Sequence, residues 1–349
     1  AGLRLRTPVP GTKARRAIAE GRAELLARCM SQLAGGIVDG SLRIDGVLMQ
    51  ARQWDARRVT PGLIADLMLP AWERARFRAL ELNDRLPRIA CDSTLRLEAA
   101  DHVVHSSRAP NELAEDPVSE AAVRIGESVA EIVPDGATIE LGVGRALAGV
   151  VPALAAGRRN LAMHTGIVGN AAMRLIEAGC VSRAVRGTAW AVGATAMGTA
   201  AFYAWADAHP HIALVDSRIA HASKTLAALP RFVAINGGLQ IDLQGNVNST
   251  VYKGRTISGA GGAPDFAAAG AAAQASVIAL FATGHDGSPG IVERVEAVSV
   301  SGNLVTHVVT EHGVAGIRGL AGAARARALA AIAAPAHREA LLAAAARFA

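Results

Sequence analysis

From about residue 118 onward, the sequence alternates between amphipathic helical segments and short apolar strands. Parallel strands need a long connection, usually a helix, so this alternation is typical of a parallel sheet with helices on its faces. The sequence therefore predicts an α/β fold with a parallel-rich sheet. The expected helices are 118–133, 146–156 and 170–178, and the expected strands are 137–141 and 161–164.

The first 110 residues show a less regular pattern. We expect amphipathic helices at 12–34 and 62–78, and strands at 41–44, 47–50 and 79–82. The polar segment 106–117, which contains two prolines, is the best candidate for a linker. Because domains span roughly 100–200 residues, a chain of 349 residues is expected to form two domains, 1–110 and 111–349.

The composition excludes disorder and favours close packing. Apolar residues make up 51% of the chain and charged residues 19%, which argues against intrinsic disorder. Many of the apolar residues are alanine, so each buries little area and the helices and strands must approach closely. The most apolar stretch, 266–283, contains Gln274 and Ser276 and predicts a buried helix that leads into a strand, not a membrane span.

The basic surplus and the cysteines limit the possible partners. The net charge is +6, and only three of the 36 basic residues are lysine. The arginines are scattered and aromatic residues make up only 3%, so we expect neither nucleic acid nor a membrane as a partner. Cys29, Cys91 and Cys180 lie far apart without a partner at ligand spacing, which predicts no metal site, no disulfide and a cytoplasmic protein.

A Gly-Val-Gly turn at 142–144 follows one expected strand and precedes an expected helix. The backbone amides of Gly142 and Gly144 can approach a phosphate or carbonyl oxygen closely, assisted by the positive end of the helix. Leu147 stands where a dinucleotide fingerprint needs a small residue, and no acidic residue follows at ribose distance, so a nicotinamide enzyme is not expected. A tight turn without a ligand remains an equal alternative.

A second glycine-rich segment, 257–266, precedes the alanine-rich helix. Gly259, Gly261 and Gly262 leave the backbone bare, and Arg255 lies just before them. Backbone amides in such a loop can line an oxyanion or phosphate site, so we favour a binding loop over a plain connection.

Two further segments carry polar residues at strand ends. A strand, a Gly-Asn turn and a returning strand are expected at 234–249, with Asn236, Gln240, Asp242, Asn246 and Asn248 at even spacing. They form either a ligand-facing edge or a solvated face. Glu311 and His312 follow a strand at 308–310 and could act in acid–base chemistry, although a role in holding the loop is the simpler reading.

These four segments, in this order, resemble the acetyl-CoA hydrolase/transferase family, which includes 4-hydroxybutyrate and related CoA-transferases. The family pattern reads approximately DGATLQLGIG, INSALEVDLTGQVNAE, ISGVGGQxDF and VVTEYGVAxLRG. The chain has DGATIELGVG at 135–144, INGGLQIDLQGNVNST at 235–250, ISGAGGAPDF at 257–266 and VVTEHGVAGIRG at 308–319. The resemblance extends from about residue 35 to residue 349.

The resemblance implies two CoA-transferase-like α/β domains with the active site between them, the N-terminal domain being shortened. It also implies a coenzyme A thioester as substrate, with no permanently bound cofactor, a carboxylate or other acyl acceptor, and a homo-oligomer or a partner subunit. In such enzymes a glutamate of the LEVD block attacks the acyl-CoA carbonyl, and a glutamyl-CoA thioester forms in the next step.

The chain departs from the family pattern at the nucleophile. Gln240 occupies the glutamate position, Gly237 and Gly238 precede it, and Glu140 replaces the glutamine of the first block. A carboxamide cannot form the acyl anhydride. Either the site retains only acyl-CoA binding, or Glu140 or Glu311 activates water or another acceptor, or a Glu→Gln change was introduced into the chain.

We therefore expect an enzyme that binds an acyl-CoA or acyl-carrier thioester and acts by hydrolysis or direct acyl transfer. The amides near Gly144 and at 259–262 would hold the thioester or acyl oxygens, Asn236 and Gln240 would contact the reacting carbonyl, and Arg255 would meet the phosphates of coenzyme A. The alternative is a catalytically silent subunit that binds coenzyme A or a partner chain.

Overall fold

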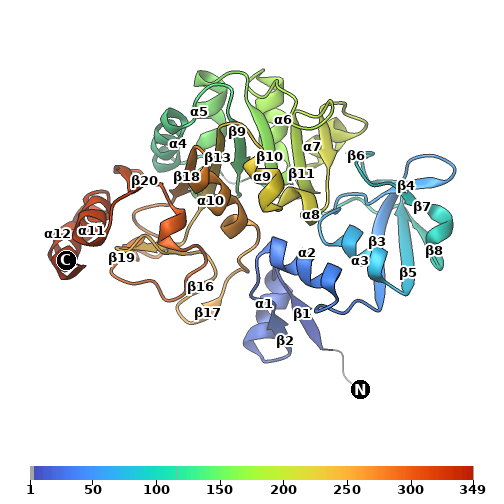
Figure 1. The fold of residues 1–349 in the computed structure, drawn as a ribbon, viewed down its shortest axis with the longest axis horizontal. Helices are drawn as coiled ribbons and strands as arrows, with labels where there is room; N and C mark the ends of the chain where they lie inside the picture. Colours follow the sequence, from blue (N-terminus) through green and yellow to red (C-terminus); the bar gives the residue numbers. More distant parts are fainter. Residues whose placement is uncertain (1–3, 116, 349) are drawn as a thin grey trace.

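Two sheets contain most of the strands in the computed structural model, which describes residues 4–115 and 117–348 (Figure 1). The larger sheet has nine strands: β6 (Ala90–Cys91), β9 (Thr138–Leu141), β10 (Ala162–Val168), β11 (Ala191–Ala196), β12 (Ile212–Leu214), β13 (Phe232–Gly237), β18 (Ala275–Ala279), β20 (His307–Thr310) and β21 (Gly313–Gly316). All neighbours pair in parallel except β20 and β21, which form an antiparallel hairpin. The predicted parallel α/β fold is confirmed.

The direction in which strands are added to this sheet reverses at β9. The order is β21-β20-β18-β13-β9-β10-β11-β12-β6, so the chain adds β10, β11 and β12 on one side of β9 and β13, β18 and β20 on the other. In an open α/β sheet, the crevice at the carboxyl ends of the two strands flanking such a reversal is the usual ligand site. The residues that follow β9 and β13 are therefore the first candidates for a functional site.

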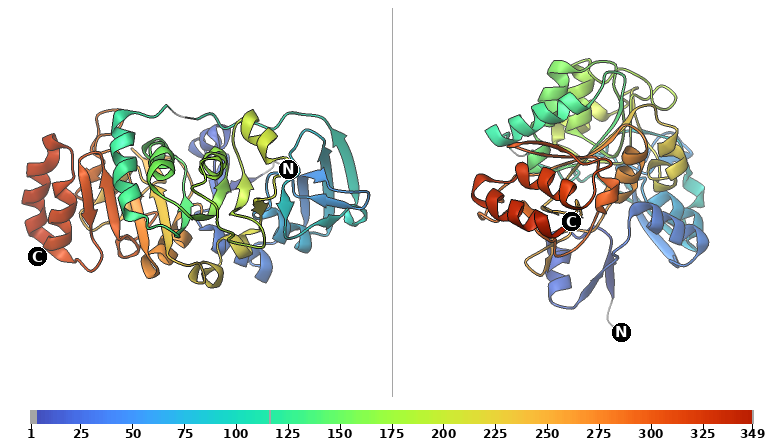
Figure 2. Two further views of the ribbon diagram at one scale, coloured as in Figure 1. Left: turned by 90° about the horizontal axis from the view of Figure 1, so that it is seen from above. Right: turned by 60° about the vertical axis from the view of Figure 1, so that its left-hand side comes forward.

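Helices cover both faces of the larger sheet, as the views in Figures 1 and 2 show. Right-handed crossovers that run in opposite directions from β9 must place their helices on opposite faces. The helices expected after residue 118 are confirmed, although the second of them, predicted over 146–156, begins with a separate 3₁₀ turn, Arg145–Leu147. One face has α4 (Glu120–Ile132), α5 (Val150–Gly157), α6 (Asn170–Glu177) and α7 (Ala200–Ala206), and the other has α8 (Ser217–Ala220), α9 (Ser223–Ala227) and α10 (Ala263–Ala272).

The second sheet belongs to the N-terminal part of the chain. Its strands are β3 (Gly46–Gln53), β4 (Arg58–Thr60), β5 (Phe77–Asn83), β7 (Leu95–Arg96) and β8 (His102–Ser106), in the order β7-β4-β3-β5-β8. β3, β5 and β8 are parallel to one another, while β4 pairs antiparallel with both of its neighbours. The predicted strands 47–50 and 79–82 are confirmed and are longer than expected.

The single helix predicted over 12–34 is wrong. The structure instead has α1 (Thr12–Ala19), β2 (Ala23–Leu25) and α2 (Met30–Asp39). Gly21 adopts a left-handed conformation with φ of 69°, and β2 pairs in parallel with β1 (Leu5–Thr7). The glycine ends the first helix, and the pairing with β1 outweighs the helical spacing of the apolar residues.

Two other N-terminal predictions fail for a similar reason. Residues 41–44 form no strand, because α2 ends at Gly40 with φ of 84° and the Ser41 amide then donates a hydrogen bond to the Asp39 carboxylate. The helix predicted over 62–78 contracts to α3 (Met68–Arg74), because Gly62, with φ of 59°, forms a turn before it and β5 begins at Phe77. Glycines in the left-handed region mark these boundaries.

The segment predicted as a linker, 106–117, lies between β8 and α4, and residue 116 is outside the described residues. The segment is attached to the larger sheet's helices: the Tyr203 hydroxyl donates to the Asn111 carbonyl, and the Glu112 carboxylate accepts from the amide of Ala200. β6, which precedes this segment, is the edge strand of the larger sheet. The domain boundary at residue 110 stays a prediction.

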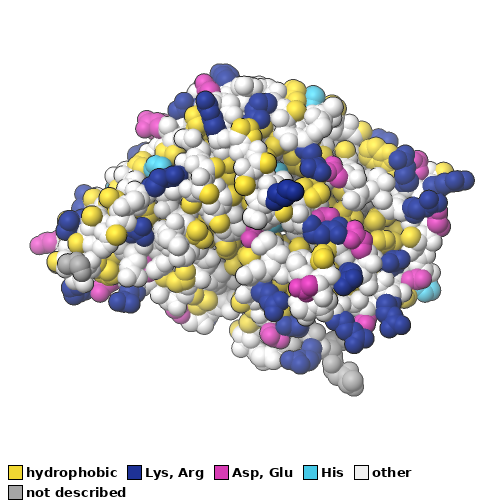
Figure 3. Space-filling view, in the orientation of Figure 1, with side chains coloured by type: hydrophobic (Ala, Val, Ile, Leu, Met, Phe, Trp, Pro, Cys, Tyr) yellow, Lys and Arg dark blue, Asp and Glu magenta, His cyan; other side chains and the backbone are white. Residues whose placement is uncertain are grey.

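Smaller elements complete the C-terminal part. A three-stranded sheet consists of β15 (Val247–Asn248), β14 (Gln240–Asp242) and β19 (Ile291–Val292), and β16 (Val251–Tyr252) forms a hairpin with β17 (Arg255–Thr256). The chain ends with α11 (Gly322–Ala331) and α12 (Pro335–Ala345). Basic side chains are spread over the face seen in Figure 3. Among the described residues, no helix is long and apolar enough to cross a membrane.

The expected close packing is seen where α4 crosses the start of α5. A methyl group at Gly126 would overlap the backbone carbonyl of Gly149, and one at Gly149 would overlap the carbonyl of Ala122. The two backbones are therefore in direct contact. This approach compensates for the small side chains of a core rich in alanine.

We predict that Gly126→Ala lowers the free energy of unfolding by about 1–3 kcal/mol, because the added methyl group forces the two helices apart. Chemical denaturation measures this difference. The control is Gly157→Ala in the last turn of α5, where an added methyl group would meet nothing within 4 Å, and this variant should be unchanged or more stable. Equal stability of the two variants would contradict the packing argument.

Candidate functional site

The carboxyl ends of β9 and β13 bring three of the predicted site residues together. The Gly142 amide donates a hydrogen bond of 2.9 Å to the Ile235 carbonyl of β13. A side chain at Gly142 would meet Asn236 Oδ1 at 3.0 Å, so glycine lets the turn after β9 lie directly against Asn236. Asn236 in turn contacts Glu140 of β9. Glu140, Gly142 and Asn236 therefore lie together at the reversal point of the sheet.

Glu140 lies beneath this turn with only 2% of its surface exposed. Its Oε2 atom accepts hydrogen bonds from Asn236 Nδ2 at 2.7 Å and from the Ile235 amide at 3.2 Å. Burial raises the pKa of the Glu140 carboxyl to about 8, against the lowering effect of these two bonds. Glu140 is therefore a buried group that orients the Asn236 side chain through a hydrogen bond.

The turn itself offers two backbone amides. Gly142 uses its own amide to bond β13, whereas the amides of Val143 and Gly144 donate no hydrogen bond within the described part of the chain. Gly144 has φ of 150°, a conformation that residues with side chains rarely adopt. The positive end of a helix was expected here, but α5 begins only at Val150, so no α-helix N-terminus directly follows the amides of Val143 and Gly144.

Gln240 lies on β14, at the first residue after the short turn that follows β13, and is partly exposed. Its Nε2 donates a 3.1 Å hydrogen bond to the Pro289 carbonyl. The neighbouring Ile241 amide donates to Gly290, and the Gly290 amide donates to Ala282. Gln240 is thus attached to the loop 280–290 after β18, a loop that the sequence reasoning did not include although its run of glycines, serine and proline indicates a turn.

Glu311 is hydrogen-bonded to the same loop, at Ala282, whereas Gln240 bonds it at Pro289. It follows β20, as predicted, and its Oε2 accepts a 2.9 Å hydrogen bond from the Ala282 amide. His312 Nε2 lies 4.0 Å from Glu311 Oε1, and the Glu311 side chain is 11% exposed. The loop 280–290 therefore connects Gln240 with Glu311, and the second Glu311 oxygen faces the half-buried imidazole.

The second glycine-rich loop contacts the N-terminal part of the chain. A side chain at Gly259 would overlap the Pro8 carbonyl, the Gly261 carbonyl accepts a 3.1 Å bond from Met30, and a side chain at Gly262 would overlap the ring of His221. The absence of side chains is therefore required for packing at Gly259 and Gly262. His221 also lies close to β10, the strand next to β9, because a side chain at Gly166 would meet its ring at 3.8 Å.

A buried polar cluster below this loop was not predicted. Asp265 accepts bonds from both the amide and the hydroxyl of Ser31, at 3.0 and 2.5 Å, and so caps α2. His221 Nδ1 lies 3.6 Å from Asp265 Oδ2 and has no hydrogen-bond partner within the described residues. Burial, with nearby His164 as a smaller cause, lowers the pKa of His221 to about 3. These residues are far apart in sequence, so spacing gave no signal.

The remaining predicted residues serve other purposes or stay separate. Asp242 accepts bonds from the amides of Gln244 and Asn246, and Asn248 bonds the amide and carbonyl of Val251, so these buried side chains hold turns and do not face a ligand. Arg255 is exposed on the β16–β17 hairpin. Among the described residues, no group of three possible metal ligands occurs.

A parallel sheet whose reversal point carries two backbone amides without a hydrogen-bond partner in the described chain, beside an oriented carboxamide, is an α/β fold with a candidate small-molecule site at its strand ends. Comparisons with known proteins give the family. Residues 198–345 match the sequence model of the acetyl-CoA hydrolase/transferase C-terminal domain. The 4-hydroxybutyrate coenzyme A transferase of Clostridium kluyveri is 30% identical over 338 residues, which cover 94% of this chain and 78% of the relative.

Two further matches agree with this. The succinyl-CoA:acetate/propanoyl-CoA:succinate CoA transferase of Fasciola hepatica is 28% identical, over 95% of this chain and 71% of the relative. The crystal structure of RipA from Yersinia pestis superposes with a TM-score of 0.87 at 26% identity, over 95% of this chain and 78% of the other. The chain belongs to the acetyl-CoA hydrolase/transferase family, whose enzymes use coenzyme A thioesters. The predicted family is confirmed, and the assignment of Gln240 to the nucleophile position stays a prediction.

We predict that Glu140→Gln becomes increasingly stabilising as the pH rises. The buried carboxyl keeps its proton up to about pH 8, whereas the unfolded chain releases it near 4.5. The wild-type protein therefore loses stability, relative to the neutral variant, as the pH rises from 4.5 to about 8.

Denaturant unfolding at a series of pH values measures this difference. The control is Glu339→Gln on the exposed surface of α12, which removes the same charge and should show no such slope. A stability difference between wild type and Glu140→Gln that is independent of pH would show that Glu140 is ionised in the folded protein.

Proposed function

We propose that this chain binds an acyl-CoA or acyl-carrier thioester at the carboxyl ends of β9 and β13 and cleaves it by hydrolysis or direct acyl transfer, without a glutamyl-CoA intermediate. The observation that carries the proposal is the pair of free amides at Val143 and Gly144 beside an oriented Asn236. Two amides and a carboxamide can bind the oxyanion that forms when a nucleophile attacks a thioester carbonyl.

The apolar surroundings support an acyl substrate. Val143 is 60% exposed and Leu239, next to Gln240, is 39% exposed. An exposed apolar side chain on each of the two turns offers contacts to the acyl chain or to the pantetheine part of the substrate. The relatives in Clostridium kluyveri and Fasciola hepatica are both named as transferases of coenzyme A.

Glu311 is the better candidate for a general base. Glu140 is buried and bonded through Oε2 to two groups of β13, whereas Glu311 bonds one amide with Oε2 and leaves Oε1 beside His312. Glu311 would remove a proton from water or another acceptor as the acceptor oxygen attacks the carbonyl carbon. The carbon–sulfur bond then breaks, and the thiolate takes a proton to leave as free thiol.

Gln240 is suited to a holding role. A carboxamide donates to the Pro289 carbonyl, whereas a glutamate carboxylate at 3.1 Å from that carbonyl oxygen would be repelled. Gln240 would therefore maintain the loop 280–290 and present its oxygen side to the substrate region. The same bond also supports the second candidate, a catalytically silent subunit, because the side-chain NH₂ group of Gln240 is already engaged by the Pro289 carbonyl.

We predict that the protein releases free thiol from at least one acyl-CoA in a panel of chain lengths, and that Glu311→Gln lowers the rate by about 10²–10⁴-fold, as expected for loss of a general base. A thiol-reactive dye follows the release. The control is Glu339→Gln on α12, which should keep the wild-type rate. No turnover across the panel, with thermal stabilisation by coenzyme A retained, would instead support the silent subunit.

We predict that Gln240→Glu gains coenzyme A exchange between an acyl-CoA and a carboxylate, because it restores a carboxylate at the position that the family uses as nucleophile. Mass spectrometry of exchange with a labelled carboxylate measures this gain, and Gln274→Glu at an exposed position is the control. A covalent, borohydride-sensitive adduct that forms with acyl-CoA on the wild-type protein would refute both candidate functions.

A further inference from the structure

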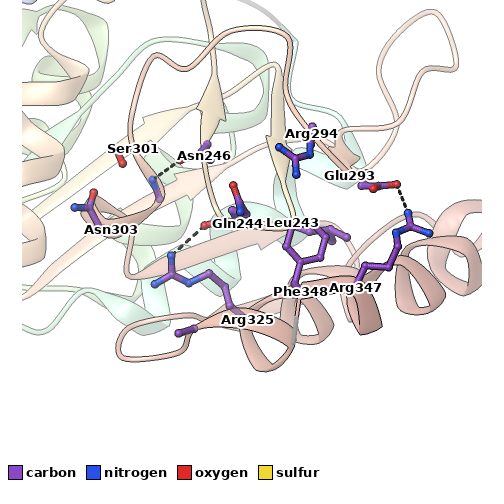
Figure 4. Close-up of a pocket in the computed structure, with 13 residues that line it drawn as sticks. Leu243, Gln244, Asn246, Glu293, Arg294, Ser301, Asn303, Arg325, Arg347 and Phe348 are labelled. Carbon is purple, nitrogen blue, oxygen red and sulfur yellow. Dashed lines mark hydrogen bonds and ion pairs between the residues drawn. The ribbon is translucent and has the colours of Figure 1, made fainter.

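A groove with a volume of about 710 Å³ lies away from the β9–β13 site, where β14 and β19 end. Its walls come from the turn after β14, the residues after β19, the 3₁₀ turn Gly302–Leu304, the start of α11 and the C-terminal residues (Figure 4). Five separate segments of the chain thus converge on one space. Its volume is within the range of small-molecule sites, roughly 300–1,000 Å³.

The groove has an excess of positive charge. Arg294, Arg325 and Arg347 line it, and Glu293 is the one carboxylate among its lining residues. Glu293 forms an ion pair of 2.5 Å with Arg347. Among the described residues, the Arg325 guanidinium donates only to the neutral carbonyls of Leu320 and Gln244.

Arg294 is exposed and forms no ion pair or hydrogen bond within the described residues (Figure 4). Two guanidinium charges, those of Arg294 and Arg325, are therefore uncompensated in one concave surface. Like charges in a concavity raise the local potential and attract anions.

Neutral groups in the groove complement these charges. The side chains of Gln244, Ser301 and Asn303 line it and make no hydrogen bond to the rest of the described chain. α11 begins at the groove with neither a capping side chain nor an acidic residue in its first turn, so its free amides add to the positive potential. The ring of Phe348 provides a flat apolar surface beside the arginines.

We propose that this groove binds an organic phosphate of mononucleotide size, with the phosphates at Arg294 and Arg325 and a planar ring against Phe348. Guanidinium groups pair with phosphate oxygens through two parallel N–H donors, which makes arginine the preferred residue for this recognition. The free amide and hydroxyl side chains can bind the ribose and the ring edges.

Two ligands present a phosphate together with a planar ring: a free nucleotide, and the phosphorylated adenosine end of coenzyme A. β14 and β19 run parallel to each other from Gln240 and Pro289 toward the groove. Leu243 lies three positions after Gln240, which is about 10 Å along an extended strand. The proposal that the groove binds a phosphate does not depend on the proposed function.

The test is calorimetric titration of the full chain with ADP, adenosine and coenzyme A. We expect saturable binding of ADP, weak or no binding of adenosine, and a loss of ADP affinity of about tenfold or more in Arg294→Gln combined with Arg325→Gln, equivalent to about 1.4 kcal/mol. The matched control is Arg327→Gln, an exposed arginine on the same helix that does not line the groove, and its affinity should stay within about twofold of the wild type.

Competition distinguishes the two sources. If the groove holds the end of coenzyme A, ADP displaces coenzyme A and the double variant weakens both ligands alike. If it holds a free nucleotide, ADP and coenzyme A bind together and only ADP is weakened. Both results support the groove, and neither requires turnover, so failure of the catalytic proposal would be seen separately.

Two results would overturn the proposal: no saturable binding of ADP at millimolar concentration, or equal ADP affinity in the wild type and the arginine variants. Arg325 also bonds two backbone carbonyls, so the double variant could lose stability. The single Arg294→Gln variant avoids this, because Arg294 is exposed, and it should weaken ADP by several-fold while the thermal midpoint stays unchanged.

Discussion

The buried hydrogen bonds between Glu140 and β13 are the interaction on which the site depends. They connect the two strands at which the strand order of the sheet reverses, and they fix Asn236 beside the turn after β9. Burying a charged carboxylate at this depth costs free energy. Burial raises the pKa of Glu140 to about 8, so the group keeps its proton and stays neutral below that pH. Glu140 is therefore a buried, neutral group that orients Asn236 beside the turn after β9.

Those strand ends come from several parts of the chain. The turn after β9 supplies free amides, β14 supplies Gln240, and β20 is followed by Glu311. The loop 280–290 bonds both Gln240 and Glu311, so it holds the two side chains in a common frame. This frame explains why a carboxamide at position 240 is compatible with the fold, because Gln240 donates to the Pro289 carbonyl while Glu311 accepts from the Ala282 amide.

The sequence anticipated the part of the structure in which local and long-range preferences agree. The alternation after residue 118 correctly predicted the parallel sheet, and the order of the motif blocks identified the family. It failed where distant pairing decides the local structure. The apolar spacing of 12–34 is helical, yet Gly21 ends the helix and β2 pairs with β1, because backbone hydrogen bonds between strands outweigh small differences in helix propensity.

By itself, the sequence determined which chemical groups are present: glycines that free the backbone, a carboxamide at position 240, and a surplus of arginine. Only the tertiary structure decided what each group does. It buried Glu140, used Gly259 and Gly262 for packing against Pro8 and His221, and gathered arginines that follow different elements into one groove. The physical reason is that burial, hydrogen-bond partners and local charge arise from residues distant in sequence, and these set the pKa and reach of every polar group.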